Sequence, residues 1–341
     1  TPPSYRFDIA IEEDLIEELA RVHGYENIPP ASVQATAVML PQSEARRRLL
    51  DIKKIMVLRD YLETVNYAFV EADWERKLYG NDAPVALQNP IASQMSVMRS
   101  GLLGGLLGVL SANLARRQPR VRLFETGGCF ARTADGYTQT ERLGGLIYGA
   151  ALAEQWGVPA RSVDFFDAKG DVEALFSPAR PEFVAAPHPA SHPVRSAKIL
   201  LNGKTVGWIG ELHPQWQHHH DLPQPVVWFE LELDALTQAK LPAAAEPSRF
   251  PPVRRDLAVV VEERVETQTL LNAMQAAQAP YVVELALFDL YRGKGVEQGK
   301  KSLAFRVLLQ DTHKTLTEAE IDQSMARLVS ALQSQGAQLR V

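Results

Sequence analysis

Apolar residues near the start of the chain recur at helical spacing. Leu15, Leu19 and Val22 lie at positions i, i+4 and i+7, and a glycine follows as a stop signal. This pattern predicts a helix over residues 11–23. A second amphipathic pattern begins at a serine suited to an N-cap and predicts a long helix over residues 43–66.

Short apolar runs with strand and helix patterns alternate from there to about residue 236. Helices are expected over residues 100–117 and 164–176. The run AKILLNGKTVGWIGEL, residues 197–212, contains an Asn202-Gly203 pair, which is a strong signal for a type I′ turn. Because a tight hairpin joins antiparallel strands, we expect an α+β domain built on an antiparallel sheet.

The last part of the chain alternates in a recognisable order. The pattern predicts strand 256–261, helix 267–277, strands 282–291 and 302–310, helix 316–333 and strand 337–341. That order, βαββαβ, is typical of the ferredoxin-like split unit. The low-complexity segment QAKLPAAAEP before it is the best candidate for a linker.

Composition restricts the class of protein. The chain has 341 residues, 46% of them hydrophobic and 23% charged, and a net charge of −5. This is ordinary globular composition, and no apolar run approaches the roughly 20 residues of a membrane span. One cysteine, Cys129, excludes an internal disulfide framework and any multi-cysteine metal site. We expect a cytoplasmic protein. Because the chain opens without Met inside an ordered pattern, we also expect a piece of a longer one.

Basic residues are enriched in the last part relative to the rest. From Pro247 onward, 12 Lys or Arg face 11 Asp or Glu, whereas the remainder has 24 against 30. The stretch LFDLYRGKGVEQGKKSLAF, residues 287–305, places glycines and lysines between two predicted strands. Lysines there could neutralise phosphates and an aromatic residue could stack on unpaired bases. On charge alone, a basic surface loop that only aids solubility explains the pattern equally well.

Carboxylates gather at the first predicted helix. Asp14, Glu17 and Glu18 are three or four residues apart, so they share one face, and Asp8 lies just before the helix. Oxygen ligands suit Mg²⁺, which would relieve their mutual repulsion. The competing interpretation is that acids in the first turns complement the helix dipole on a solvated face.

Several further residues have more than one possible role. The predicted helix 100–117 is rich in glycine, which suits packing inside a core or against another chain. The predicted strand VRLFETGGCF carries Arg122, which could bind phosphate or belong to an exposed strand pair. His188, His192 and His213 each neighbour a proline, which favours a role in loop structure. No nucleophile elbow, P-loop or dinucleotide fingerprint is present.

Several motifs together resemble one family, the beta subunits of bacterial phenylalanyl-tRNA synthetase. They are YRFDIAIEEDLIEELARVHGYENIP, NPIASQMSVMRSGLLGGLL, RLFETGGCF, HPVRSA, GWIGELHP, FPPVRRDLAVVV and FDLYRGKGVEQGKKSLAFRVLLQDTHKTLTEAEI. They occur in the family's order over essentially the whole chain, which resembles the C-terminal portion of such a subunit.

The resemblance implies four parts. Residues 1–30 would end a small helical domain with an acidic magnesium motif, and 31–238 would form a catalytic-like class II synthetase core without catalysis. Residues 239–247 would be a linker, and 248–341 a ferredoxin-fold anticodon-binding domain. Editing and N-terminal tRNA-binding modules would lie upstream of this chain.

The resemblance also implies ligands and partners. Magnesium, shared with an alpha subunit, would bind Asp8, Asp14, Glu17 and Glu18. ATP would bind the alpha subunit, in a heterotetramer of two alpha and two beta subunits. The partner nucleic acid would be tRNA(Phe), and we expect no membrane partner. The residues expected to contact tRNA are Arg249, Phe250, Arg254, Arg255, Tyr291, Arg292, Lys294, Lys300 and Lys301.

No catalytic residue is expected in this chain. Class II catalysis needs a glycine-rich strand-to-helix segment that ends in Glu-Arg, and the Glu-Arg pairs at Glu75, Glu141 and Glu263 lack that setting. The absent segment agrees with what the resemblance implies, a non-catalytic subunit of phenylalanine-tRNA ligase that is inactive by itself. The alternative is a free-standing RNA-binding scaffold with a degenerate synthetase core.

Overall fold

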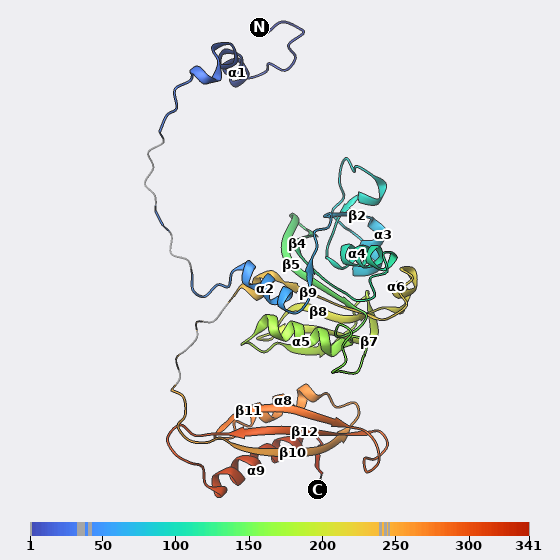
Figure 1. The fold of residues 1–341 in the computed structure, drawn as a ribbon, viewed down its shortest axis with the longest axis vertical. Coiled ribbons are helices and arrows are strands. Elements are labelled where there is room, and N and C mark those ends of the chain that lie inside the picture. Colours follow the sequence, from blue (N-terminus) through green and yellow to red (C-terminus); the bar gives the residue numbers. More distant parts are fainter. Residues whose placement is uncertain are drawn as a thin grey trace. The chain divides into compact units, whose positions relative to one another are not determined.

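The computed structural model describes residues 2–32, 38–39, 43–238, 241, 244 and 246–340 (Figure 1). The chain separates into two units, Thr1–Ser43 and Glu44–Val341. In the first unit, helix α1 (Glu12–His23) ends at Gly24, and a 3-10 turn, η1 (Tyr25–Asn27), follows. The helix predicted over residues 11–23 is therefore confirmed.

A seven-stranded mixed sheet organises the larger part of the second unit. Its order is β1-β4-β5-β9-β8-β7-β6, and each neighbouring pair is antiparallel apart from the parallel pair β1/β4. The strands are β1 (Leu62–Glu63), β4 (Val121–Thr133), β5 (Gly136–Tyr148), β6 (Glu182–Ala185), β7 (Ser191–Leu201), β8 (Lys204–Leu212) and β9 (Val226–Glu232). A small separate pair joins β2 (Phe69–Val70) to β3 (Val97–Met98).

Helices cover both faces of this sheet, which explains why six of the seven residues of its central strand β9 are buried. The helices are α2 (Leu49–Leu58), α3 (Ala72–Tyr79), α4 (Leu103–Ala115), α5 (Phe165–Phe176), α6 (Pro214–His219) and α7 (Leu233–Thr237), with a 3-10 turn η2 (Ser93–Met95). Phe229 and its alternate neighbours pack into one core with α2 and α5, whereas Trp228 packs into a second core with α3 and α4.

The sequence predicts the hairpin turn at Asn202-Gly203 correctly, but it predicts one helix that is too long. Asn202 and Gly203 take φ values of 52° and 77°, as the predicted type I′ hairpin requires. The helix predicted over residues 43–66 is only α2. It ends because Asp60 adopts a φ of 67° and the Tyr61 N–H turns back to the Met56 carbonyl. The apolar pattern continues beyond it as β1.

A buried carboxylate on β9 fixes the start of α4. Glu230 is 4% exposed and accepts hydrogen bonds from the backbone N–H groups of Leu102 and Leu103, each at 2.9 Å. It also accepts from the Tyr79 hydroxyl at 2.7 Å and pairs with Arg142 at 3.3 Å. Unpaired N–H groups at a helix start attract a carboxylate, so this contact locks α4 onto the sheet. Burial beside Glu230 also raises the pKa of Tyr79.

Two more buried carboxylates hold the segment just before α4. Glu75 accepts from the backbone N–H of Ser100 at 3.0 Å and from its hydroxyl. Glu125, on β4, pairs with Arg99 at 2.7 Å and accepts from the side-chain amide of Asn66, also at 2.7 Å. Both carboxylates are at most 2% exposed, so each lies among several donors, as burial of a charge requires.

A fourth buried carboxylate, Asp171 of α5, lies beside the core that contains α2 and α5, and it binds two arginines. It accepts from the Tyr61 hydroxyl at 2.7 Å, from Arg59 at 2.5 Å and from Arg122 at 3.2 Å. The Arg122 side chain is only 9% exposed. Neither alternative from the sequence holds for Arg122, because it is neither exposed nor available to a phosphate.

Glycines in and before α4 serve internal packing. A Cβ added at Gly101 would lie 2.3 Å from the Tyr79 ring, and one at Gly104 would lie 2.7 Å from the Trp74 ring. At these two positions the chain passes so close to aromatic rings of α3 that a residue larger than glycine would clash. At Gly108 an added Cβ meets nothing within 4 Å among the described residues.

The C-terminal part forms the predicted βαββαβ unit. Its elements are β10 (Val253–Glu262), α8 (Thr267–Ala276), β11 (Val282–Tyr291), β12 (Lys300–Leu309), α9 (Glu318–Ser334) and β13 (Gln338–Leu339). The sheet order is β11-β12-β10-β13, which is the ferredoxin-like arrangement, and the register of β11 against β12 shifts at two irregularities. Residues from β10 and β12 pack with α8 and α9 into one core.

The predicted linker over residues 239–247 falls mostly on residues outside the described ranges. Across the helices of the described ranges, none is long and apolar enough to span a membrane.

Two glycines of α4 provide a matched test of this packing. Gly104→Ala is expected to destabilise the protein by about 1–3 kcal/mol, because its methyl group overlaps the Trp74 ring. Gly108→Ala is expected to stabilise it by up to about 1 kcal/mol, because alanine favours a helix and the space there is open. Urea unfolding followed by circular dichroism measures both, and equal effects would contradict internal packing at Gly104.

Candidate nucleic-acid interface

The glycine- and lysine-rich segment forms the loop between β11 and β12 of the four-stranded sheet. It begins after Tyr291, the last residue of β11, and ends at Lys300, the first of β12. Gly295 and Gly299 have φ values of 91° and 84°, a region that residues with a Cβ rarely adopt. The Tyr291 hydroxyl donates to the Lys294 carbonyl at 3.2 Å, which ties the loop to the strand.

Carboxylates partner several cations of this loop. Arg292 pairs with Glu263 at 2.6 Å and Lys300 with Glu297 at 2.8 Å. The guanidinium of Arg292 lowers the pKa of Glu263. The Lys294 side chain is exposed. These are solvent-exposed pairs of the kind that contribute little to stability, so they position the cations without burying them.

Lys301 differs from its neighbours. It is 9% exposed, and its ammonium donates to the Glu263 carbonyl at 2.9 Å. The side chain therefore anchors the loop to the end of β10. Its charge lies below the surface, away from the position that the sequence suggested for a phosphate contact.

The residues upstream of and within β10 that were expected to contact tRNA do not form one cluster. Arg254 pairs with Asp256 at 2.9 Å, and its guanidinium lies 5.6 Å from the centre of the Phe288 ring. Arg255 pairs with Glu318 at the start of α9, at 2.8 Å. Arg249 is exposed. Phe250 is half-buried, and its carbonyl accepts from Gln310 at 2.7 Å.

One face of the four-stranded sheet is open to solvent. Leu257, Val259 and Val261 of β10 belong to the core with the helices, so the alternate residues of the strand point away from it. The same alternation on β12 places Ser302, Ala304 and Arg306 on the open face.

Aromatic and cationic side chains meet on this open face. The Arg340 guanidinium donates to the Ser302 hydroxyl at 3.2 Å and lies 5.2 Å from the centre of the Tyr291 ring. Phe288 and Tyr291 are 50% and 38% exposed. The structure therefore brings Tyr291 and Arg254 of the predicted set to one surface.

Sequence reasoning missed three residues of this surface, Phe288, Arg306 and Arg340, and the buried Ser302 that Arg340 contacts. The signal was present in the period of two along β12, which assigns Ser302 and Arg306 to one face. The place of Arg340 could not be read in this way, because it depends on how β13 pairs with β10.

The acidic motif of the first unit is held by its own neighbours. Arg6 pairs with Asp8 at 2.7 Å and with Glu18 at 2.9 Å. Asp14 accepts from the backbone N–H groups of Ala10 and Ile11, at 2.7 and 2.9 Å. Hydrogen bonds from Arg6 and Arg21 lower the pKa of Glu18 to about 2.

Glu17 is exposed on the same helix. No three His, Cys, Asp or Glu side chains come close enough to hold a metal ion in the part of the chain that the structure describes. Three of the four carboxylates that the sequence assigned to magnesium, Asp8, Asp14 and Glu18, therefore accept hydrogen bonds from arginine side chains or backbone N–H groups in this structure.

Three family models match the chain in succession. Residues 1–25 match a tRNA synthetase B5 domain, residues 28–233 match a phenylalanyl tRNA synthetase beta chain CLM domain, and residues 248–340 match a ferredoxin-fold anticodon binding domain. The second match alone covers more than half of the chain.

Curated relatives agree with these matches. The phenylalanine-tRNA ligase beta subunit of Nitrosospira multiformis is 53% identical over 341 residues, which cover 100% of this chain and 43% of the relative. The beta subunit of Chromobacterium violaceum is 52% identical over 339 residues, with 99% and 43% covered. That of Dechloromonas aromatica is 52% identical over 349 residues, with 100% and 44% covered. The chain thus spans less than half the length of these relatives.

Proposed function

The chain belongs to the family of phenylalanyl-tRNA synthetase beta chains, and on that premise we propose that it forms part of the non-catalytic subunit of a phenylalanine-tRNA ligase. The observation that carries this proposal is the succession of three family matches, each on a segment with its own fold. The subunit would support ATP-dependent attachment of phenylalanine to its tRNA, while an alpha subunit carries out the chemistry.

We propose the division into residues 1–30, 31–238, 239–247 and 248–341, with a class II synthetase-like core in the second part. The largely antiparallel sheet between two helical layers supports that assignment. Exposed apolar residues on α2 support a partner surface there, since Leu50, Val57 and Leu58 are 57%, 58% and 84% exposed. Exposed apolar residues that gather on one helix are typical of a protein interface. The partner would be the alpha subunit of the heterotetramer.

Reconstitution tests this function directly. The beta subunit that contains this chain, co-expressed with a class II alpha subunit, is expected to co-purify with it and to charge tRNA(Phe) with phenylalanine. The 341-residue chain alone is expected to give no ATP–pyrophosphate exchange with any amino acid. Failure to associate with the alpha subunit would contradict the proposal and favour a free-standing RNA-binding scaffold.

We propose that the open sheet face and the β11–β12 loop bind the tRNA anticodon region. Exposed aromatic rings can stack on unpaired bases, and the adjacent guanidinium and ammonium groups can contact phosphates. Tyr291, Phe288 and Arg340 supply this combination on one surface. The Lys294 side chain adds a cation at the edge of that surface.

Two variants separate these contributions in a tRNA-binding titration at several salt concentrations. Lys294→Ala is expected to reduce the slope of log affinity against log salt by about 0.7, the loss of one phosphate contact. Tyr291→Ala is expected to weaken binding by about 1–3 kcal/mol with little change in slope, because stacking involves no counterion release. Arg327→Ala, on the exposed side of α9, serves as the control. If it matched Lys294→Ala in slope, the loop would be a solubility feature only.

We propose further that the acidic motif binds Mg²⁺ in the assembled enzyme. Carboxylate oxygens are the donors that this ion prefers, so the chemistry of Asp8, Asp14, Glu17 and Glu18 fits it. Arg6 contacts two of these carboxylates, and an ion would have to displace its guanidinium from them.

Amide substitutions test the magnesium site. Changing Asp14 to Asn together with Glu17 and Glu18 to Gln is expected to raise the magnesium concentration that gives half-maximal aminoacylation, because the ligand charge is lost. Glu13→Gln, in the same helical turn but outside the motif, controls for general surface charge. An unchanged magnesium titration would return the motif to the helix-dipole interpretation.

A further inference from the structure

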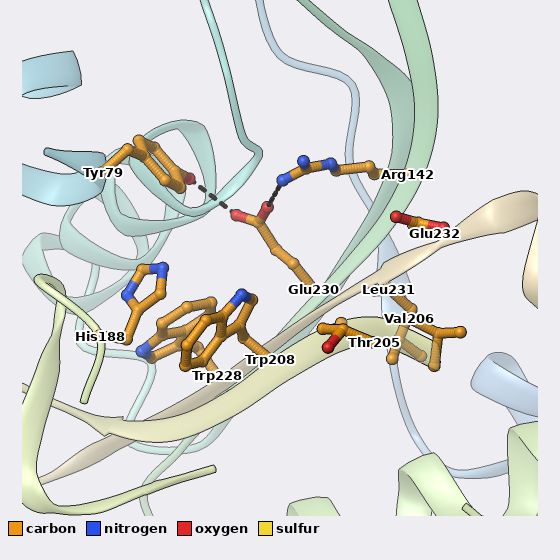
Figure 2. Close-up of a pocket in the computed structure, with 11 residues that line it drawn as sticks. Tyr79, Arg142, His188, Thr205, Val206, Trp208, Trp228, Glu230, Leu231 and Glu232 are labelled. Carbon is orange, nitrogen blue, oxygen red and sulfur yellow. Dashed lines mark hydrogen bonds and ion pairs between the residues drawn. The ribbon is translucent and has the colours of Figure 1, made fainter. Parts of the chain in front are cut away.

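The loop between β5 and α5 carries the one tryptophan of five whose side chain is exposed. Trp208 and Trp228 line the small pocket shown in Figure 2, and Trp74 and Trp216 pack into the core beside α3 and α4. Trp156, in the middle of the loop, is fully exposed. Tryptophan offers a large apolar surface for burial and is enriched among the residues that dominate protein binding. Trp156 is therefore a candidate contact residue.

Contacts at both ends of the loop fix its base. The Ala151 N–H donates to the Arg161 carbonyl at 2.9 Å, which closes the loop. The Arg161 guanidinium contacts both carboxylate oxygens of Asp167, in the first turn of α5, at 2.7 Å each. A surface whose base is already ordered loses less conformational entropy when it binds.

Other exposed apolar side chains belong to the same surface. Leu152 and Val158, in the same loop, are 51% and 47% exposed. Phe166 is 73% exposed, and it lies in the helical turn to which the loop is tied. Exposed apolar residues that gather in this way are typical of an interaction site. These three residues and Trp156 are called the Trp156 surface below.

The charges around the Trp156 surface favour a protein over a nucleic acid. An exposed indole can stack on an unpaired base, but surfaces that bind nucleic acid carry an excess of cations. Here three carboxylates, Glu154, Asp164 and Asp167, accompany one cation, Arg161. An apolar centre with a polar rim is the anatomy of a protein–protein interface.

Arg120 connects this loop to the end of α2. Its Nε donates to the Ala150 carbonyl at 3.1 Å, and another of its nitrogens contacts the Asp60 carboxylate, also at 3.1 Å. Asp60 follows α2, and its neighbours Leu58 and Leu62 are 84% and 70% exposed. The exposed apolar residues of α2 and those of the loop are therefore joined through a single arginine, so one partner can reach both.

We propose that the Trp156 surface extends the exposed apolar surface of α2 into one binding site for the alpha subunit, and that the affinity depends most on Trp156. The partner would present an apolar recess for the indole ring, with lysine or arginine at its rim to complement Glu154 and Asp164. This inference rests on the proposed function, because the alpha subunit is the partner named there.

The dissociation constant of the two subunits tests the role of Trp156. The complete beta subunit that contains this chain would be mixed with the alpha subunit over a range of concentrations and analysed by sedimentation velocity. Trp156→Ala is expected to weaken association by about 30-fold or more, as loss of a central aromatic residue does. The fold is expected to stay intact, because the side chain is fully exposed. Tyr137→Ala, 67% exposed near the opposite end of β5, is the control and should leave association unchanged.

The same titration separates this inference from the proposed function. If the wild-type subunits associate and Trp156→Ala associates equally tightly, the inference is overturned and the proposed function stands. If the wild-type subunits do not associate at all, both are overturned.

Oxidation by hydroxyl radicals, followed by mass spectrometry, identifies what covers Trp156. In the complete beta subunit alone, the Trp156 side chain is expected to be oxidised readily, and addition of the alpha subunit is expected to protect it. Protection in the beta subunit alone would assign the cover to another segment of the same polypeptide or to a second copy, and that result would overturn the proposal. Ready oxidation in the assembled complex would overturn it as well.

Discussion

Burial of carboxylates within the larger sheet domain is the constraint on which that fold depends. A carboxylate removed from water is stable only among several donors, and those donors have to come from fixed places. Glu230 and Glu75 find theirs in backbone N–H groups before and at the start of α4. The helix therefore has one position on the sheet. That position requires glycine at residues 101 and 104, because the chain there passes directly against aromatic rings of α3.

The ferredoxin-like domain handles its charges in the opposite way. Arg254, Arg255 and Arg292 pair with carboxylates at the surface, where such pairs contribute about 0–1 kcal/mol each. An arginine held so weakly can exchange its carboxylate for a phosphate at little cost. The pairs also orient the guanidinium groups and offset their positive charges.

Local patterns in the sequence predict most of the helices, strands and turns. They do not predict contacts between residues that are far apart in the sequence. The Asn202-Gly203 turn and the βαββαβ order depend on neighbouring residues and on periodicity, and both were predicted. The early end of α2 depends on Asp60 and on pairing of β1 with β4, which periodicity cannot reveal. Charge alone could not separate Lys301 from Lys294 either. One ammonium is buried against a backbone carbonyl and the other side chain is exposed, a difference that only the path of β10 decides.

The edges of both sheets have a consequence for the behaviour of the protein in concentrated solution. An exposed strand edge can pair with another chain and start aggregation. The seven-stranded sheet ends in two-residue β1 and four-residue β6, and the four-stranded sheet ends in two-residue β13. The other outer strand of the four-stranded sheet, β11, carries two register irregularities that interrupt a regular ladder. Along β11 these interruptions reduce the tendency of an exposed strand with aromatic residues to pair with a second copy of the chain.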